Sequence, residues 1–306
     1  MLIVNPQAGP TAVQSELPAV LTYLESNRWW TTLHQTAQPG EATQLARQAC
    51  DRAMDAVLVV GGDGTINEVV NGIACSEVAL GVLPGGTGNV WAKELGLPTR
   101  SALHRLPLLD AVKILIPGTH RRIDLGRANG RYFLQWAGLG LDAEVTYAME
   151  PRTRIQRRMG AVAYLAAGVN TAANMVGRRT RIVIDDRLIY RRSILIVVSN
   201  SQLYGGVVRI AGDARLDDGL LDVDVFEGKA FSSIMRTFLS VISGLHVYDH
   251  RHSAYQVRTI RIYTDKPMAV HLDGEPFGST PFECEVVPQS LVVLLPTRTR
   301  PELFSS

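Results

Sequence analysis

This chain of 306 residues has few cysteines, no long apolar run and almost balanced charge. Its three cysteines, Cys50, Cys75 and Cys284, are far apart and lack C-x-x-C spacing, which argues against a disulfide framework or a zinc cluster. No run of about 18 apolar residues occurs, so we expect no membrane span. The sequence begins directly in a strand-like apolar pattern, so we expect no leader peptide. These features favour a cytoplasmic protein with reduced thiols.

The net charge of +2 argues against a dedicated nucleic-acid binder, while 46% hydrophobic and 20% charged residues exclude an extended disordered chain. The charge is nevertheless uneven. Residues 150–192 contain 10 arginines against Glu150, Asp185 and Asp186. Such a segment suits an anionic surface such as phospholipid headgroups, and a solvated basic face is the alternative.

Short apolar runs alternate with helical patterns over residues 1–124. Strands are expected at 2–4, 31–36, 56–60 and 79–83, and helices at 11–26, 41–52, 66–73 and 90–95. This alternation predicts an α/β domain with an open, mainly parallel sheet. In such sheets ligands bind at the carboxyl ends of the strands.

Residues 125–306 show a different pattern, which predicts a β-rich, sandwich-like domain whose last residues pack back on the first. Asn129-Gly130 and Asp185-Asp186 each separate two alternating runs and predict hairpin turns. Later strands are expected at 258–265, 268–275, 282–287 and 290–296, divided by Lys266-Pro267, by 276–281 and by Pro288-Gln289. Helices are expected at 155–176 and 231–245.

The motif GGDGT at 61–65 follows an apolar strand and opens a helix. Glycines allow close approach of the backbone to a ligand, and a helix N-terminus presents free N–H groups to an anion. The chain has no P-loop lysine, and Asp63 would repel bare phosphate, so Asp63 is expected to act on Mg²⁺ or its water. The alternative is a plain turn in which Thr65 is the helix N-cap and Glu68 completes a capping box.

A second glycine-rich loop, LPGGTGN at 83–89, follows the next expected strand. Two such neighbouring loops would cradle a polyphosphate, with Thr87 and Asn89 adding hydrogen-bonding groups; alternatively, Asn89 is a helix N-cap. The GLGLDA segment at 138–143 matches a dinucleotide fingerprint only weakly, because the strand before it belongs to a hairpin.

Two acidic segments complete the candidates. Residues 213–225 place Asp217, Asp218, Asp222 and Asp224 around one turn, which is either a tight turn or a site for a hard cation. In LDGE at 272–275, Asp273 and Glu275 are expected to share a strand face, where paired carboxylates suit general-base and metal chemistry. An exposed pair of turn acids is the alternative.

Together these motifs resemble the diacylglycerol kinase catalytic family of bacterial lipid kinases, which is related to the sphingosine kinases. The resemblance rests on NPQAG (5–9), GGDGTINEVVNG (61–72), LPGGTGN (83–89), AGLGLDAEV (137–145), YGG (204–206), DDGLLDV (217–223) and LDGE (272–275). The chain departs from the family at Val90, where many bacterial members have aspartate.

The resemblance implies an ATP-binding domain at 1–124 and a lipid-substrate domain at 125–306. The implied nucleotide contacts are Asn5, Thr36, Gly61, Gly62, Asp63, Gly64, Thr65, Ile66, Asn67, Gly86, Thr87 and Asn89. Asp63 would be linked through water to catalytic Mg²⁺. A structural magnesium site would use the Asp218 carboxylate and the carbonyls of Arg215 and Leu220. Asp273 or Glu275 would be the general base.

The implied function is transfer of the ATP γ-phosphoryl group to a lipid hydroxyl, with diacylglycerol and phosphatidic acid as the expected substrate and product. Alternatives are a sphingoid or other lipid, NAD as acceptor, and a non-catalytic lipid-binding protein with a relic nucleotide fold. The expected partners are a lipid substrate and an anionic membrane surface touched peripherally, with a homodimer as an option and no nucleic acid. The apolar segment 161–176 would admit acyl chains or form a buried core helix.

Overall fold

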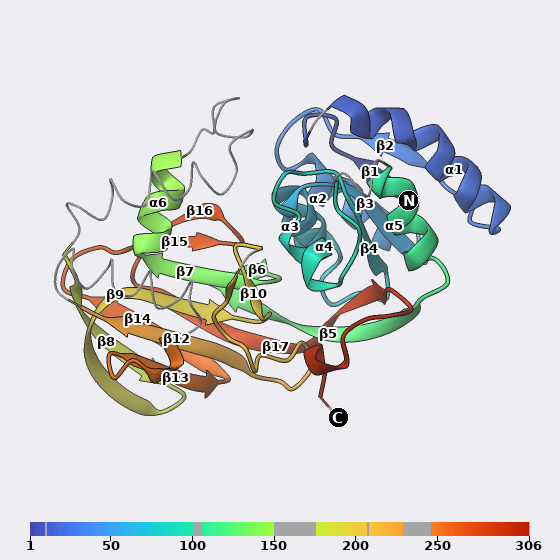
Figure 1. The fold of residues 1–306 in the computed structure, drawn as a ribbon. Helices are drawn as coiled ribbons and strands as arrows, with labels where there is room; N and C mark the ends of the chain where they lie inside the picture. Colours follow the sequence, from blue (N-terminus) through green and yellow to red (C-terminus); the bar gives the residue numbers. More distant parts are fainter. Residues whose placement is uncertain (10, 101–105, 150–175, 207, 229–245, 306) are drawn as a thin grey trace. The chain divides into compact units, whose positions relative to one another are not determined.

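A computed structural model describes residues 1–9, 11–100, 106–149, 176–206, 208–228 and 246–305 (Figure 1). The chain forms two compact units. The N-terminal unit comprises residues 1–125 together with 288–304, and the C-terminal unit comprises residues 126–287. Two long strands, β5 (Thr119–Ala128) and β17 (Phe282–Leu295), each contribute residues to both units.

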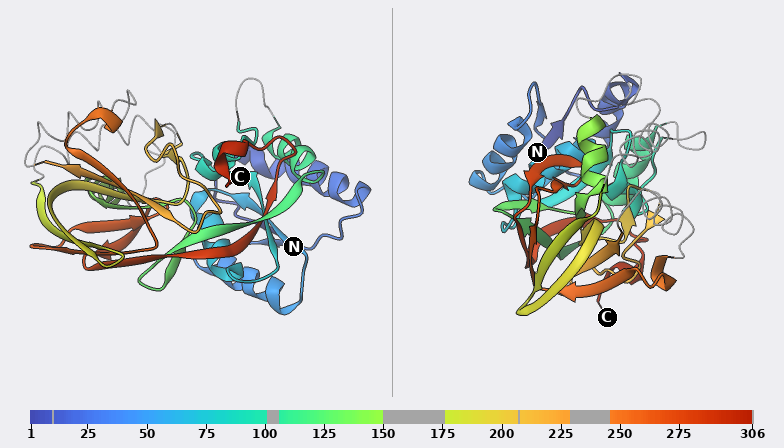
Figure 2. Two further views of the ribbon diagram at one scale, coloured as in Figure 1. Left: turned by 90° about the horizontal axis from the view of Figure 1, so that it is seen from below. Right: turned by 90° about the vertical axis from the view of Figure 1, so that its left-hand side faces the viewer.

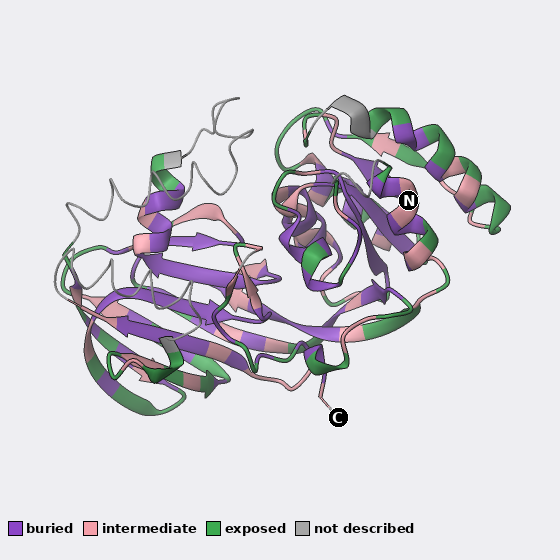
Figure 3. Cartoon of the chain, in the orientation of Figure 1, coloured by how far each residue is buried: buried purple, intermediate pink, exposed green. Residues whose placement is uncertain are grey.

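The N-terminal unit is an α/β domain, as the sequence predicts. Its strands are β1 (Leu2–Val4), β2 (Leu33–Gln35), β3 (Ala56–Gly61) and β4 (Ala79–Pro84). Its helices are α1 (Leu17–Ser26), α2 (Glu41–Asp51), α3 (Asp63–Ile73), α4 (Val90–Glu94) and α5 (Pro107–Leu115), with short 3₁₀ turns η1 (Thr11–Glu16) and η3 (Pro301–Leu303). Strands β3 and β4 are buried along their whole length (Figure 3), which explains their unbroken apolar sequences.

Strand order positions the candidate site in this unit. The strands pair in parallel in the order β17-β4-β3-β1-β2. The chain therefore runs from β1 outward to β2 and then from β3 outward to β4 in the opposite direction. The carboxyl ends of β1 and β3 flank the point where this direction reverses, which is where open α/β sheets bind ligands.

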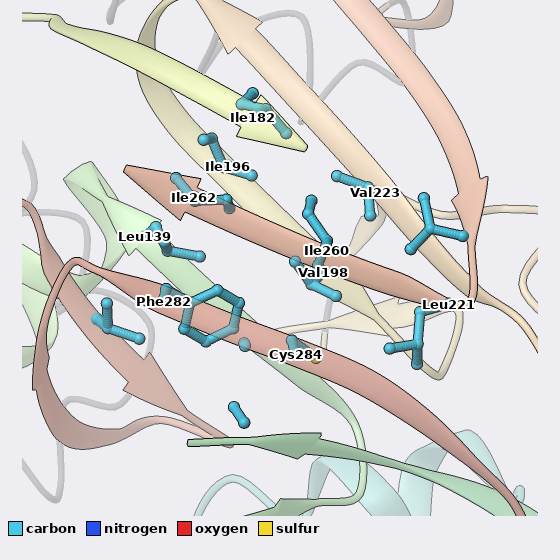
Figure 4. Packing of buried hydrophobic residues seen from close by; sticks show 14 of the residues in the cluster. Leu139, Ile182, Ile196, Val198, Leu221, Val223, Ile260, Ile262, Phe282 and Cys284 are labelled. Atoms are coloured by element: carbon cyan, nitrogen blue, oxygen red, sulfur yellow. The ribbon is translucent and has the colours of Figure 1, made fainter. Parts of the chain in front are cut away.

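The C-terminal unit is β-rich, also as predicted. Its elements are β6 (Arg131–Phe133), β7 (Trp136–Gly140), α6 (Leu141–Met149), β8 (Arg178–Ile184), β9 (Arg187–Ser199), β10 (Leu203–Tyr204), β11 (Val208–Arg209), β12 (Leu221–Glu227), η2 (His246–Tyr248), β13 (His252–Val257), β14 (Thr259–Thr264), β15 (Ala269–Leu272) and β16 (Glu275–Ser279). Neighbouring strands follow the order β16-β15-β7-β9-β8-β14-β17. Figure 4 shows the core between them, where Phe282 packs among aliphatic side chains such as Leu139 and Ile262.

The hairpin predictions at Asn129-Gly130 and Asp185-Asp186 are confirmed. Asn129, Gly130 and Asp185 have positive φ angles of 44°, 88° and 46°, the backbone conformation that such tight turns require. The long β8–β9 hairpin is visible from several sides in Figures 1 and 2.

Two details of the strand prediction are wrong. The expected break at Pro288 does not occur, because β17 continues through it: residues 282–285 pair with β14 and residues 292–293 pair with β4, so the missing N–H of Pro288 falls between the two ladders. The expected loop at 276–281 is largely a strand, β16, which covers residues 275–279. Since β16 is an edge strand, its Pro276 is tolerated.

The predicted helices at 155–176 and 231–245 lie outside the described residues, apart from Val176, and so does the apolar segment 161–176. Among the helices that the structure describes, none has the length and apolarity to cross a bilayer.

Candidate active site

Asn5 and Thr65 join the ends of β1 and β3. The Asn5 Nδ2 amide donates to Thr65 Oγ1 at 3.0 Å, and the Asn5 backbone N–H donates to the Val60 carbonyl at 2.9 Å. The alternative role of Thr65 as a helix N-cap is wrong, because α3 begins at Asp63 and its N-cap is Gly62. Asn5 and Thr65 therefore fix the two loops at the reversal point against each other.

Glu68 does not complete a capping box either. Its Oε2 atom accepts a hydrogen bond from the Ala42 N–H at 3.2 Å, and its carbonyl accepts one from Thr43 Oγ1 at 2.8 Å. The side chain thus caps the start of α2 rather than α3. Its effect is to hold two helices of the unit together.

The two glycine-rich loops pack backbone against backbone. The Gly85 N–H donates to the Gly61 carbonyl at 3.0 Å. A Cβ atom on Gly86 would lie 2.5 Å from Gly62 Cα, and one on Gly9 would lie 2.0 Å from the Gly85 oxygen. Side chains cannot be accommodated at these contacts. The glycines therefore build a cradle of closely spaced backbone, the arrangement that binds phosphate groups.

Asn89 closes the second loop. It has a positive φ of 48°, and its side chain accepts from the Gly86 N–H at 2.9 Å and donates to the Gly86 carbonyl at 2.8 Å. Asn89 does occupy the N-cap position of α4, as the alternative has it, but its side chain makes no cap hydrogen bond to the helix. The two hydrogen bonds between Asn89 and Gly86 rigidify the second loop. Thr87, between them in the sequence, is exposed.

Asp63 supplies the cap that Asn89 does not. Its Oδ1 atom accepts from the backbone N–H groups of Val90 at 2.8 Å and Trp91 at 3.3 Å, the first residues of α4. A Cβ atom on Gly88 would lie 2.8 Å from Asp63 Oδ2, so this glycine makes room for the second oxygen. Asp63 therefore connects the first glycine loop to the second through the N-terminus of a helix. Sequence reasoning did not find this contact.

The other residues predicted to contact nucleotide, Thr36, Ile66 and Asn67, are buried. Thr36 is buried where β2 ends, and its N–H donates to the Val4 carbonyl at 2.9 Å. Ile66 and Asn67 are both 1% exposed in α3, and Asn67 accepts a hydrogen bond from Asn71. The loops bring Asn5, Gly61, Gly62, Asp63, Gly64, Thr65, Gly86, Thr87 and Asn89 together; Ile66 and Asn67 lie deeper.

In the C-terminal unit, Asp273 and Gly274 form the turn between β15 and β16. Their φ angles are 48° and 80°, as in a two-residue hairpin turn. The prediction that Asp273 and Glu275 share a strand face is therefore wrong, because Asp273 leaves the strand in a left-handed conformation. Glu275 is the first residue of β16.

The two acids have different surroundings. Asp273 is 5% exposed, and its carboxylate accepts three backbone N–H groups: those of Leu134 at 2.8 Å, Gln135 at 2.9 Å and Trp136 at 3.1 Å. Glu275 is partly exposed and forms an ion pair with Arg131. Asp273 is thus rigidly held, and Glu275 is the more accessible of the two.

A buried pair beside this turn was missed by sequence reasoning. His271 Nε2 is hydrogen-bonded to Asp142 Oδ2, and His271 Nδ1 accepts the Gly274 N–H at 3.1 Å. A Cβ atom on Gly138 would lie 2.2 Å from His271 Nε2, so the glycine of GLGLDA makes space for this pair. Strand β7, which contains the first residues of GLGLDA, pairs in antiparallel fashion with β9 and β15, in line with the weak match of this segment to a dinucleotide fingerprint.

The acidic turn at 217–224 brings carboxylates together, but among the described residues too few of their side chains converge to coordinate a cation alone. Asp218 Oδ1 accepts the Leu220 N–H at 3.0 Å. Burial raises the pKa of Asp218, and burial together with the charge of Asp218 raises the pKa of Asp222 to about 7. Among the described residues there is no cluster of three or more His, Cys, Asp or Glu side chains suited to a metal. A cation here would need backbone carbonyls such as those of Arg215 and Leu220.

Two family models match the sequence, one in its N-terminal part and one in its C-terminal part. Residues 1–128 match the family model described as the diacylglycerol kinase catalytic domain, and residues 136–295 match the model described as the YegS C-terminal NAD kinase beta sandwich-like domain. The chain belongs to the diacylglycerol kinase family. It is therefore a member of a lipid kinase family, with the α/β and β-rich domains of that family.

Individual relatives match along nearly the whole chain. A diacylglycerol kinase of Bacillus subtilis (strain 168) is 31% identical over 304 residues, covering 99% of this chain and 98% of that protein. One of Staphylococcus saprophyticus is 28% identical, covering 98% of this chain and 96% of the relative. A crystal structure of a diacylglycerol kinase from Bacillus anthracis str. Sterne has a TM-score of 0.76 at 25% identity and covers 98% of this chain and 96% of its own.

Proposed function

We propose that this protein transfers the γ-phosphoryl group of ATP to the free hydroxyl of diacylglycerol, giving phosphatidic acid. The observation that carries the proposal is the glycine cradle at the reversal point of the parallel sheet, where Gly61–Gly62 and Gly85–Gly86 lie backbone on backbone. The family and the names of the relatives support diacylglycerol as the acceptor.

In this proposal the cradle holds the triphosphate. Backbone N–H groups at 62–65 and 87–88, together with the N-terminus of α3, bind phosphate oxygens; the N–H groups of Gly85 and Gly86 hold the loops together instead. Asn5 and Thr65 keep the two loop ends in register, and Asn89 keeps the second loop closed. Phosphoryl transfer depends mainly on positioning and charge stabilisation, so this rigid backbone is the larger part of the catalytic apparatus.

The residues present fit a magnesium ion beside the cradle. Asp63 is partly exposed at the start of α3, and its carboxylate would hold the ion through a water molecule. When bound, Mg²⁺ neutralises charge that develops on the transferring group. Asp63 Oδ1 is fixed by the N–H groups of Val90 and Trp91, so the side chain is oriented before any ligand binds. A second, structural ion would use Asp218 with the carbonyls of Arg215 and Leu220.

The acids of LDGE would act on the lipid. Asp273 or Glu275 takes the proton of the attacking hydroxyl, and the three N–H groups on Asp273 hold the turn that carries both acids. Because ATP is a cytoplasmic solute and diacylglycerol lies in the bilayer, the proposed reaction takes place at the cytoplasmic face of a membrane.

Phosphorylation of NAD is the second candidate, because the family model of the C-terminal unit is described as NAD kinase-like. Purified full-length protein with labelled ATP and Mg²⁺ would be offered micellar diacylglycerol, a sphingoid base, ceramide and NAD, with products identified by mass. We expect phosphatidic acid as the main product. A phosphorylated nucleotide, a different phospholipid or no product would overturn the assignment, and Asp63→Asn serves as the low-activity control.

A further inference from the structure

The β9–β8–β14 part of the C-terminal unit carries an open groove of about 560 Å³. Its lining includes Arg179, Arg181 and Arg192 together with Tyr190 and Tyr263. We call this feature the arginine groove. None of these residues belongs to the phosphate cradle or to the LDGE turn.

Strand register places these side chains on one face of the sheet. Arg179 lies opposite Arg192, and Arg181 lies opposite both Tyr190 on β9 and Tyr263 on β14. Directly paired residues of antiparallel strands point to the same side, and residues two apart do so as well. The arginines and tyrosines therefore form two adjacent rows on the face opposite to Ile182, which is buried in the core.

The groove is lined by four arginines and two carboxylates, Glu227 and Asp265, so its charges are only partly balanced within the described part of the chain. Asp265 Oδ1 accepts the backbone N–H of Arg179 at 3.2 Å. Arg191 Nε forms an ion pair with Glu227 at 2.9 Å, and the Arg181 guanidinium lies 4.4 Å from the Tyr263 ring centroid. Arg179 and Arg192 have no ion-pair partner among the residues described, although like charges directly opposite each other destabilise a sheet.

The side chain of Arg192 offers a donor for an anion. The Nε atom of Arg192 is buried and has no hydrogen-bond partner in the described part of the protein. A buried donor without an acceptor costs free energy, and an arginine fork matches the oxygens of a phosphate group. A phosphate between Arg179 and Arg192 would supply the acceptor and offset the repulsion between the two guanidinium groups.

Apolar exposure beside the arginines identifies the source of that phosphate. Tyr190 is 67% exposed and Leu188 is 49% exposed, and both precede Arg192 at alternate positions along the same face of β9. Figure 3 shows exposed residues gathered on this hairpin. Aromatic and aliphatic side chains next to cationic ones are typical of surfaces that rest at a bilayer interface, whereas a site for free phosphate needs no exposed apolar neighbours.

We propose that the arginine groove binds the phosphate of an anionic phospholipid headgroup, with Tyr190 and Leu188 contacting the interface, and so docks the C-terminal unit on the membrane. The inference deepens the proposed function and rests on it, because a diacylglycerol substrate requires the enzyme to reach a bilayer. It assigns that contact to described residues of β8, β9 and β14.

The test is sedimentation of the full-length protein, without ATP, with vesicles of phosphatidylcholine alone or mixed with phosphatidylglycerol. Wild type should bind the mixed vesicles and not the neutral ones. The double variant Arg179→Gln/Arg192→Gln should bind the mixed vesicles roughly 30-fold more weakly, the effect of removing two cationic side chains from an anionic surface. A control, Arg209→Gln/Arg258→Gln, removes the same charge at exposed positions outside the groove and should bind like wild type.

Other outcomes overturn the inference. Equal weakening in the control would show unspecific attraction, and undiminished binding of the groove variant would show that the groove is not the contact. Binding of inorganic phosphate without binding of mixed vesicles would replace the lipid with a soluble anion. Thermal unfolding checks that both variants fold. Since vesicle binding is measured without turnover, intact binding combined with no phosphatidic acid would overturn the proposed function and leave the docking surface standing.

Discussion

His271 and Asp142 form a buried hydrogen-bonded pair, although they lie 129 residues apart in the sequence. The other ring nitrogen of His271 accepts the Gly274 N–H, so the ring carries its proton on Nε2 and donates it to Asp142. One histidine thereby joins the first turn of α6 to the Asp273–Gly274 turn. The geometry of the acidic turn depends on this contact as well as on its own hydrogen bonds.

Replacing the histidine should therefore be far more costly than replacing the acid. His271→Ala removes the partner of a buried carboxylate, and we expect a loss of about 3 kcal/mol or more in the free energy of unfolding. Asp142→Asn keeps an oxygen that accepts from Nε2–H and should cost clearly less. Urea unfolding of the two variants measures the difference. Equal losses would show that the pair is not arranged as described.

Asp63 has two separable roles, and two substitutions distinguish them. Asp63→Ala removes the cap of α4 along with the carboxylate, so it should lower stability by about 1 kcal/mol and abolish turnover. Asp63→Asn retains an oxygen for the Val90 and Trp91 N–H groups and should lose turnover while keeping its stability. Thermal unfolding and the lipid kinase assay are measured together. Full activity in Asp63→Asn would remove the metal role.

Alanine substitutions at Gly62 and Gly86 should distinguish the effect of the glycine cradle on folding from its effect on ATP binding. The Cβ atom of Gly62→Ala would meet only Gly86 Cα, at an ordinary 3.5 Å, whereas that of Gly86→Ala would lie 2.5 Å from Gly62 Cα. We expect Gly62→Ala to fold normally and to bind ATP at least tenfold more weakly, because the methyl group would occupy phosphate space. Gly86→Ala should also lose stability. Gly212→Ala, with nothing within 4 Å of its Cβ, is the matched control.

The sequence was sufficient where the chemistry is local. Asn129-Gly130 and Asp185-Asp186 were predicted because few residue types adopt positive φ, and the buried parallel strands were predicted because an unbroken apolar run fits burial on both faces. The close approach of the two glycine loops follows from local sequence as well, since both follow adjacent strands of one parallel sheet; that they bind phosphate stays a prediction.

Long-range partners could not be predicted. Asp63 caps helix α4, which begins 27 residues later in the sequence. The sequence around Asp63 does not reveal that the Asn89 side chain leaves the N-terminus of α4 uncapped. The continuation of β17 through Pro288 depends on which residues the neighbouring strands pair with. The orientation of Asp273 depends on three N–H groups that another segment supplies. Each of these is decided by tertiary packing.

Glu16 makes stability depend on pH in a defined direction. Its carboxyl accepts the N–H groups of Leu108 and Leu109 at the start of α5, but burial raises its pKa above the ordinary value of 4.5. The folded state therefore binds the proton more tightly than the unfolded state, and its contribution to stability is lost as the pH rises through the folded pKa. Glu16→Gln should be more stable than wild type at neutral pH, with the difference disappearing below about pH 4.5. Urea unfolding across this range measures it, and a constant difference would contradict it.

The acids of the LDGE turn should respond differently to loss of charge. Asp273→Asn replaces an acceptor oxygen by an NH₂ group facing backbone N–H donors, so it should lower the free energy of unfolding by about 1–3 kcal/mol in addition to reducing turnover. In Glu275→Gln the amide oxygen still accepts a hydrogen bond from the partly exposed Arg131 guanidinium, so stability should change by less than about 1 kcal/mol. Its kcat should nevertheless fall by on the order of 100-fold if Glu275 takes the proton of the lipid hydroxyl. Unchanged kcat in Glu275→Gln, beside a large loss in Asp273→Asn, would assign the base to Asp273, and activity in both variants would remove the acid pair from the mechanism.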